Sequence, residues 1–156
     1  MQTWREKVLR TVLALWVGGL VAIDIVEAPA RFRAPGVERK QITAVGRTVF
    51  AAFNRYQLLL GAVGIPAALR GPRWRTLSIA GMIATTLAQM AVLRPWMDRL
   101  SSMPAFEERD QQNPQQHDAL RQAFRSLHRA YAGLDMLKIG LGLPALLFGE
   151  PREETR

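Results

Sequence analysis

Apolar residues gather into four long runs along this chain, separated by short polar segments. Charged residues are absent from 11–23, 56–69, 76–93 and 139–149. Only the third window reaches the roughly 18 residues that by themselves indicate a membrane-spanning helix. Each of the others reaches that length when it admits charges near an end or inside. The pattern predicts four helices at about 8–26, 42–69, 74–97 and 119–148, in one integral membrane domain covering 1–156.

Breakers and polar segments separate these predicted helices. Pro29 discourages continuation of the first helix, and Gly71 with Pro72 makes a short turn after the second. The segment 101–118 is polar and of low complexity, so we expect an aqueous loop. The last helix has no early breaker. Its first part is amphipathic and charged, so we expect that part to project from the membrane.

The third helix argues against a soluble four-helix bundle. Trp74 and Trp96 are separated by about 33 Å of helix, close to the roughly 30 Å thickness of the hydrocarbon core. Tryptophan concentrates at both membrane interfaces. Between residues 78 and 93 the polar residues are too few to form a water-facing side. We therefore expect a membrane bundle.

Small residues recur at every fourth position in two of the predicted helices. The first helix has Ala14, Gly18 and Ala22 in this spacing, and the third repeats it with alanines at 80, 84 and 88. Faces of this kind let membrane helices approach closely. We expect both faces to contact neighbouring helices.

Charge and composition narrow the functional class. The chain has 156 residues, 49% of them hydrophobic, and a net charge of +8 that comes mainly from arginine. The arginines flank the apolar runs, as in "WREKVLR" and "LRGPRWR", where their long stems let guanidinium groups reach a phosphate headgroup layer. No recognition helix or stacking motif accompanies them, so we expect no nucleic-acid partner.

The beginning of the chain resembles a signal peptide, with a basic start, an apolar stretch and a "VEA" ending. Pro29 would lie just after the cut, and Asp24 interrupts the apolar run. We interpret this segment as a retained first helix. Cysteine is absent, which excludes disulfides and thiolate metal sites.

The second and fourth helices resemble each other. Residues 47–69 align with 125–147 at an offset of 78, and both end in the pattern G-x-P-A-x-L. Chance similarity between apolar helices is the alternative explanation. We favour duplication of a helical hairpin, giving two parallel repeats in which Gln57 corresponds to Asp135.

Several polar residues fall within the apolar runs, where a charge facing lipid near the midplane costs about 3 kcal/mol or more. We expect them to turn inward, and Asp135 and Lys138 are close enough on one helix to pair. Two interpretations stay open for this pair: a relay for a proton or substrate, or a structural ion pair. The acids at the end of the first helix are typical of a solvated helix terminus. The candidate cluster comprises Arg47, Asn54, Gln57, Gln89, His128, Tyr131, Asp135 and Lys138, and the helix-end acids are Asp24 and Glu27.

The sequence contains few residues that could form a catalytic, haem or metal site. A haem held by two histidines needs a partner for His128, and the other histidine, His117, lies in or beside the predicted loop. Zinc or copper at His128 would lack thiolates and a second imidazole. No nucleophile elbow, P-loop or HExxH motif occurs. We expect no catalytic residues, no metal and no cofactor.

A family resemblance covers nearly the whole chain. "GGL" in the first helix is followed by "APARF", then "VGRTVF", and later "FRSLH" leads into the last helix. With these short motifs the chain resembles bacterial four-helix membrane proteins related to animal transmembrane protein 205. The resemblance implies a four-helix integral membrane fold of undefined activity, with a link to metal-drug resistance in the animal member only. The acids of "AIDIVEAP" and the Asp135–Lys138 pair depart from the family pattern.

Three functional hypotheses follow. The first is a non-enzymatic protein of the bacterial cytoplasmic membrane that handles small solutes or ions, or acts in stress or resistance. The second is a structural or assembly module that docks a partner through the last helix and the 101–118 loop, with a homo-oligomer as one form. The third is a small membrane oxidoreductase that uses His128. The lipid bilayer is the one partner common to all three.

Overall fold

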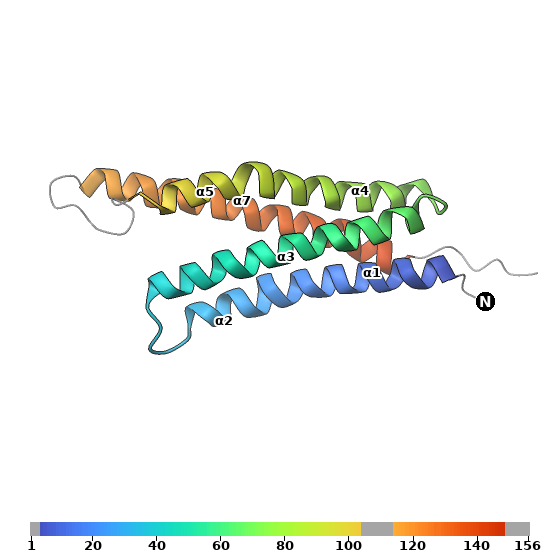
Figure 1. The fold of residues 1–156 in the computed structure, drawn as a ribbon, viewed down its shortest axis with the longest axis horizontal. Helices are drawn as coiled ribbons and strands as arrows, with labels where there is room; N and C mark the ends of the chain where they lie inside the picture. Colours follow the sequence, from blue (N-terminus) through green and yellow to red (C-terminus); the bar gives the residue numbers. More distant parts are fainter. Residues whose placement is uncertain (1–3, 104–113, 149–156) are drawn as a thin grey trace, which may run out of the picture.

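The computed structural model describes residues 4–103 and 114–148, and the regular structure within these ranges is entirely helical (Figure 1). Four helical rods run along the long axis of the molecule. The first consists of α1 (Trp4–Leu20), η1 (Val21–Glu27) and α2 (Ala28–Phe32), and the second is α3 (Arg39–Ala68). The third consists of α4 (Arg73–Ala88), η2 (Gln89–Leu93) and α5 (Arg94–Ser101), and the fourth is α7 (Pro114–Leu147).

Two rods contain a π-helical turn, and each such turn stands just before a proline. Pro29 and Pro95 are the second residues of α2 and α5. A proline inside a helix lacks the N–H donor and its ring crowds the carbonyl four residues earlier. The wider π-turn relieves this crowding, and the backbone N–H of Ala28 bonds the carbonyl of Ile23 five residues back. The prolines therefore widen the rods without breaking them.

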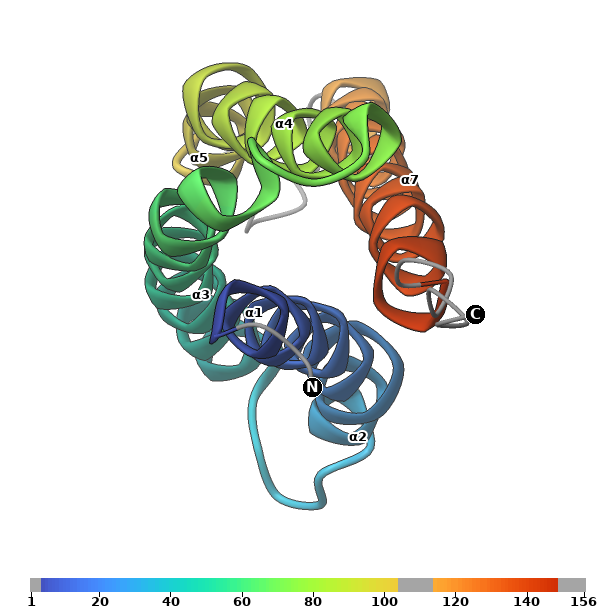
Figure 2. The same cartoon turned by 90° about the vertical axis from the view of Figure 1, so that its right-hand side faces the viewer.

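Seen along the long axis, the rods form a ring in the order α1, α3, α4 and α7 (Figure 2). Each packs against the next in this order, and α7 closes the ring against α1. Diagonal pairs, α1 with α4 and α3 with α7, lack extensive backbone contact within the described residues. Side chains must therefore fill the middle of the ring and connect its opposite members.

The distribution of side chains is that of a membrane protein. Large apolar residues point outward: Leu59 is 67% exposed and Leu77 is 70% exposed. The largest fully buried side chains include Arg75, Lys138 and Gln57. Three rods, Trp4–Phe32, Arg73–Ser101 and Pro114–Leu147, are long and apolar enough to cross a membrane. Because an apolar exterior of this extent is unstable in water, the chain is a multi-pass membrane protein.

The predicted helices correspond to the four rods with changes at their ends. The third extends to Ser101, and the last begins at Pro114, five residues before the predicted start. The prediction of a loop over all of 101–118 is therefore wrong for 114–118, because Pro114 occupies the first helical position, where a missing N–H is harmless. Residues 104–113 of that loop lie outside the described residues. A fourth membrane span, formed by α3, stays a prediction.

The expectation for the small-residue faces is wrong. Ala14, Gly18 and Ala22 are all exposed, and so are the alanines at 80, 84 and 88. Close approach occurs instead at glycines of α3 and α7. A Cβ atom at Gly61 would lie 2.7 Å from Ile83, and one at Gly142 would lie 2.7 Å from Val17. The missing side chains at these positions set the spacing between rods.

We predict that Gly142→Leu destabilises the bundle, because its side chain would overlap Val17 and Met82. Overpacking of this kind costs about 1–3 kcal/mol. The matched control is Gly140→Leu, two residues away on α7, where a Cβ atom would have nothing within 4 Å. Thermal unfolding in detergent, followed by circular dichroism, should show a lower midpoint for Gly142→Leu only. Equal midpoints would contradict this packing.

Candidate functional site

The side-chain amide of Gln57, on α3, lies at the centre of the ring. Its Oε1 accepts hydrogen bonds from the indole Nε1 of Trp16 at 2.9 Å and from the Lys138 Nζ at 2.6 Å. The Thr86 hydroxyl lies 3.3 Å from the same oxygen and also donates to the Met82 carbonyl at 2.9 Å. One amide oxygen thus contacts donor groups from each of the other three rods.

Lys138 is held on α7 by three oxygen atoms. Besides Gln57, its Nζ contacts Asp135 Oδ1 at 2.6 Å and Gln89 Oε1 at 2.8 Å. Lysine carries three ammonium protons, so each has an acceptor. The Lys138 side chain is 0% exposed and that of Asp135 is 3% exposed. The Lys138 ammonium is therefore shielded from solvent and paired with a carboxylate. Buried charges are tolerated in proteins when they are paired in this way.

A second set of bonds continues from this pair. The Nε2 of Gln89 donates to Asp135 Oδ1 and to the Tyr131 carbonyl, both at 3.0 Å. The Tyr131 hydroxyl donates to Asn54 Oδ1 at 2.9 Å, and Gln57 Nε2 donates to the same oxygen at 3.3 Å. We call Asn54, Gln57, Gln89, Tyr131, Asp135 and Lys138 the central polar cluster. All six residues are buried.

Two polar atoms near this cluster have no hydrogen-bond partner in the described part of the chain. They are the buried Nδ2 of Asn54 and the buried Oδ2 of Asp24, which lies on η1. Because η1 packs against α7, Asp24 stands on the same side of the bundle as the cluster. Unpaired buried polar atoms are rare in proteins, so each of these two calls for an explanation.

The cluster lies about half a hydrocarbon thickness from the end of the bundle where α1 begins, and farther from the opposite end. Gln57 is about 16 Å from the end of α3 at Ala68, and Trp16 about 18 Å from the start of α1 at Trp4, at 1.5 Å per residue. Half the hydrocarbon thickness is about 15 Å. With the start of α1 at the headgroup level, the charges of Asp135 and Lys138 would lie near the midplane, where they are most costly.

The structure brings six of the eight candidate residues together and separates the other two. Arg47 is exposed on α3 and donates to Ser101 Oγ at 3.3 Å. His128 is exposed on α7. The helix-end acids also differ: Glu27 pairs with Arg31 one turn later, whereas Asp24 is half-buried. The interpretation of Asp24 as part of a solvated terminus is wrong, because the first rod continues to Phe32 and the Asp24 Oδ2 is buried.

The sequence pattern alone does not single out two members of the network. Trp16 belongs to an apolar run, and Thr86 is one of the few polar residues of the third helix. Both could have been identified from the sequence, because each carries a hydrogen-bond donor inside an apolar run. Such donors usually find a partner when they are buried. Which partner each finds depends on the packing.

A second, partly buried ion pair lies at one end of the bundle. Arg75 of α4, 1% exposed, donates to both carboxylate oxygens of Glu6, at 2.7 and 3.2 Å, and its Nε donates to the Ala145 carbonyl at 3.1 Å. Arg10 also bonds Glu6, at 2.7 Å. This set connects α1, α4 and α7. From the sequence, these arginines are predicted to be anchors at the membrane interface, and the ion pair with Glu6 is not predicted.

The donor set of the central polar cluster consists of amide oxygens, one carboxylate, one ammonium and one phenol. Such groups bind and exchange protons or coordinate small monovalent cations, whereas histidine and paired carboxylates dominate transition-metal sites. Among residues 4–103 and 114–148, no three of His, Cys, Asp and Glu converge on a common point.

We predict that Tyr131→Phe lowers the free energy of unfolding by about 1 kcal/mol or less, the usual net value of one interhelical hydrogen bond. The replacement removes the bond to Asn54 and keeps the ring against Phe50. The matched control is Tyr56→Phe, whose ring stacks on Phe53. Unfolding by sodium dodecyl sulfate titration measures both. A larger loss for Tyr56→Phe would contradict the assignment.

We predict a larger loss, about 3 kcal/mol, for Glu6→Ala, because it leaves the Arg75 charge buried without its carboxylate. The control is Arg10→Ala, which removes the other arginine bonded to Glu6. The Arg10 side chain is 40% exposed, so its loss should cost less than about 1 kcal/mol. The same titration compares the two, and equal losses would argue against a buried pair.

Comparison with known families matches residues 11–103, which include Gln57 and Gln89, to a domain of unknown function, DUF4149. No curated protein matches the chain significantly, and neither does any solved structure. The matched range covers more than half of the chain and ends before α7. Asp135 and Lys138 therefore lie beyond it. The chain is a member of the DUF4149 family, defined by that domain of unknown function.

Proposed function

We propose that this protein is a non-enzymatic, four-span protein of the bacterial cytoplasmic membrane that carries protons or small monovalent cations through its central polar cluster. The observation that carries the proposal is the Lys138 ammonium, enclosed by oxygens of Gln57, Gln89 and Asp135 from three different rods. An ionisable residue inside a membrane is by default a candidate for ion or proton handling.

Energetic reasoning supports function over a purely structural role. Removing two charges from water costs several kcal/mol per ion, and well-packed apolar residues in place of a buried pair are often neutral or stabilising. A bundle that needed only cohesion would gain it from leucine at 135 and 138. Two charges near the midplane serve a function if one of them must gain or lose a proton, or exchange its partner, during ion movement.

Polar side chains follow the cluster toward the end of the bundle that α2 forms. On the side of α2, Asp24 offers an unpaired carboxylate oxygen, and Glu27 and Arg31 follow at the end of that rod. On the opposite side, Leu13 and Met82 are completely buried apolar residues between the cluster and the Glu6–Arg75 pair. We propose that the polar side is the access route and the apolar side the barrier.

The fourth span would be α3. Its 30 residues are about 45 Å long, enough to cross the hydrocarbon core, and it closes the ring between α1 and α4. Basic residues lower its mean hydropathy, among them the exposed Arg55. The long apolar stem of Arg55 would carry its guanidinium toward the headgroups.

An internal duplication fits this arrangement. Each proposed repeat has one rod with a π-turn and a proline, followed by one rod with a proline near its end, Pro66 in α3 and Pro144 in α7. Gln57 and Asp135 occupy corresponding positions and meet through Lys138. Ion sites of transporters with internal repeats commonly lie at such an interface. We also propose that the chain is related to the bacterial proteins that resemble animal transmembrane protein 205.

A structural or assembly module is the second candidate. It draws support from the N-terminal part of α7, which extends beyond the start of α3 (Figure 1) and exposes Arg125 and Arg129. A partner with acidic residues would find these side chains accessible. Under this hypothesis the central polar cluster stabilises the bundle and carries no ion.

We predict that the double variant Asp135→Asn/Lys138→Met abolishes ion movement while the bundle still folds, because it removes both charges together at nearly constant volume. Proteoliposomes containing a pH-sensitive dye, with an imposed pH gradient and potassium or sodium on the opposite side, provide the measurement. Wild-type protein should collapse the gradient faster than protein-free liposomes, and the variant should match protein-free liposomes.

The matched control is Asp118→Asn/Lys7→Met, which makes the same chemical changes at exposed positions. It should retain the wild-type rate. Two outcomes would overturn the proposal: a wild-type rate equal to that of protein-free liposomes, or an unchanged rate in the Asp135/Lys138 variant with a normal unfolding midpoint.

A further inference from the structure

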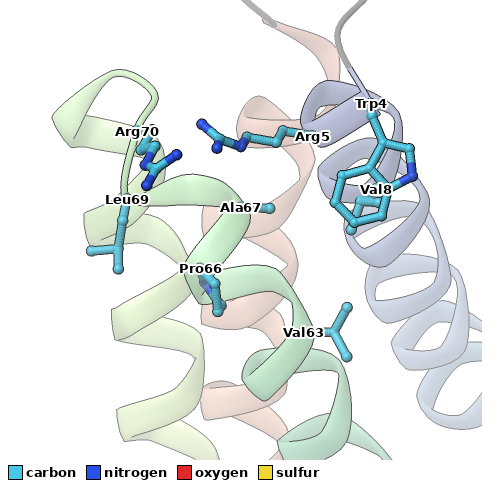
Figure 3. A pocket seen from close by; sticks show the side chains of 8 residues that line it. All are labelled: Trp4, Arg5, Val8, Val63, Pro66, Ala67, Leu69 and Arg70. Carbon is cyan, nitrogen blue, oxygen red and sulfur yellow. The ribbon is translucent and has the colours of Figure 1, made fainter.

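An open cavity of about 430 Å³ lies between α1 and α3 at the end of the bundle where α1 begins (Figure 3). Trp4 stands at its rim and is 76% exposed, and Trp74 lies at the same end, near the start of α4. Exposed tryptophans of this kind mark the level of the lipid headgroups. The cavity therefore lies at the boundary between the hydrocarbon core and water.

Two guanidinium groups point toward one another across this cavity, Arg5 from α1 and Arg70 from the turn after α3 (Figure 3). Neither makes an ion pair within the described residues. Like charges repel at such a position unless an anion lies between them. The geometry is that of a two-sided clamp for an anionic group.

The nearest carboxylate is already engaged. A second cavity of about 390 Å³ shares Arg5 and Arg70 and reaches Glu6 and Arg75. Glu6 is bonded by both Arg75 and Arg10, so its charge is shared between two guanidiniums. Among the described residues of this end no other acid is present. The surroundings of Arg5 and Arg70 thus carry a local excess of positive charge.

Below the two arginines the walls of the cavity are apolar. Val8 of α1 lines it on one side, and Val63, Pro66 and Ala67 of α3 line it on the other (Figure 3). Val63 is 55% exposed, so this apolar surface continues onto the lipid-facing side of α3. A site with cationic groups at the headgroup level and an apolar groove beneath has the polarity of a phospholipid.

We propose that this cavity binds an anionic phospholipid, with its phosphate between Arg5 and Arg70 and an acyl chain along Val8 and Val63. Guanidinium groups suit phosphate because they bind it through two parallel hydrogen bonds. The volume lies within the range of small-ligand sites. This site is separate from the central polar cluster, so its test is independent of the proposed ion handling.

The test is native mass spectrometry of the full chain in detergent, titrated with phosphatidylglycerol or with phosphatidylcholine of the same acyl chains. Arg5→Gln/Arg70→Gln should weaken phosphatidylglycerol binding about tenfold or more, since each basic residue contributes near a lipid surface. Lys7→Gln/Arg73→Gln is the matched control. It removes two positive charges from exposed positions at the same end, outside the cavity, and should bind as the wild type does.

Every other outcome would overturn the proposal. Equal weakening in both double variants indicates general attraction to the basic end, and equal binding of the two lipids indicates no headgroup recognition. Displacement by inorganic phosphate at concentrations comparable to the lipid indicates a free-anion site. If phosphatidylglycerol binds selectively only after Glu150, Glu153 and Glu154 are replaced by glutamine, the acidic end of the chain is the occupant instead.

Discussion

The contact between Gln57 Oε1 and the Lys138 ammonium is the interaction on which the rest of the bundle depends. Backbone packing holds each rod to its two neighbours and does little for the diagonal pair of α3 and α7. The Gln57–Lys138 bond at 2.6 Å crosses that diagonal, and the Trp16 bond adds α1 to the same oxygen. In a medium without water, an ammonium that lost its oxygens would find no replacement. The ring must therefore keep these groups in register.

This constraint explains why the interior is polar where the exterior is apolar. The bilayer solvates Leu59 and Leu77 well, so burying them brings no gain, and the interior is free for groups that lipid cannot solvate. Two charged sets use it, one around Asp135 and Lys138 and one at the end where α1 begins. The first consists of amides around an ion pair. The second is the ion pair in which Arg75 bonds both carboxylate oxygens of Glu6. It lies close to water, where a charge is less costly.

Backbone irregularities position these groups. The π-turns before Pro29 and Pro95 add a residue to their turns, and Asp24 and Gln89 lie within them. Gln89, at the start of the second π-turn, contacts both Asp135 and Lys138. Gly61 and Gly142 let the rods approach closely enough for these bonds to form. Proline and glycine thus act on the site without contributing a polar atom to it.

The sequence by itself determined the helices, the membrane class and most of the inward-facing polar residues. These follow from local rules: apolar run length, breakers, and the spacing that aligns Tyr131, Asp135 and Lys138 on one face. The same spacing includes His128, yet His128 is exposed. The rods splay apart toward the end of the bundle where α7 begins (Figure 1), so they cover α7 less completely there. Arg47 likewise bonds Ser101 and never meets the cluster.

Only the tertiary structure decided which groups are partners. Gln57 faces Lys138, Trp16 supplies a donor, and Arg75 finds Glu6 at a separation of 69 residues. Periodicity places a residue on a face of its own helix. The rotation and depth of the neighbouring helix, set by glycine contacts and π-turns, determine what that face meets.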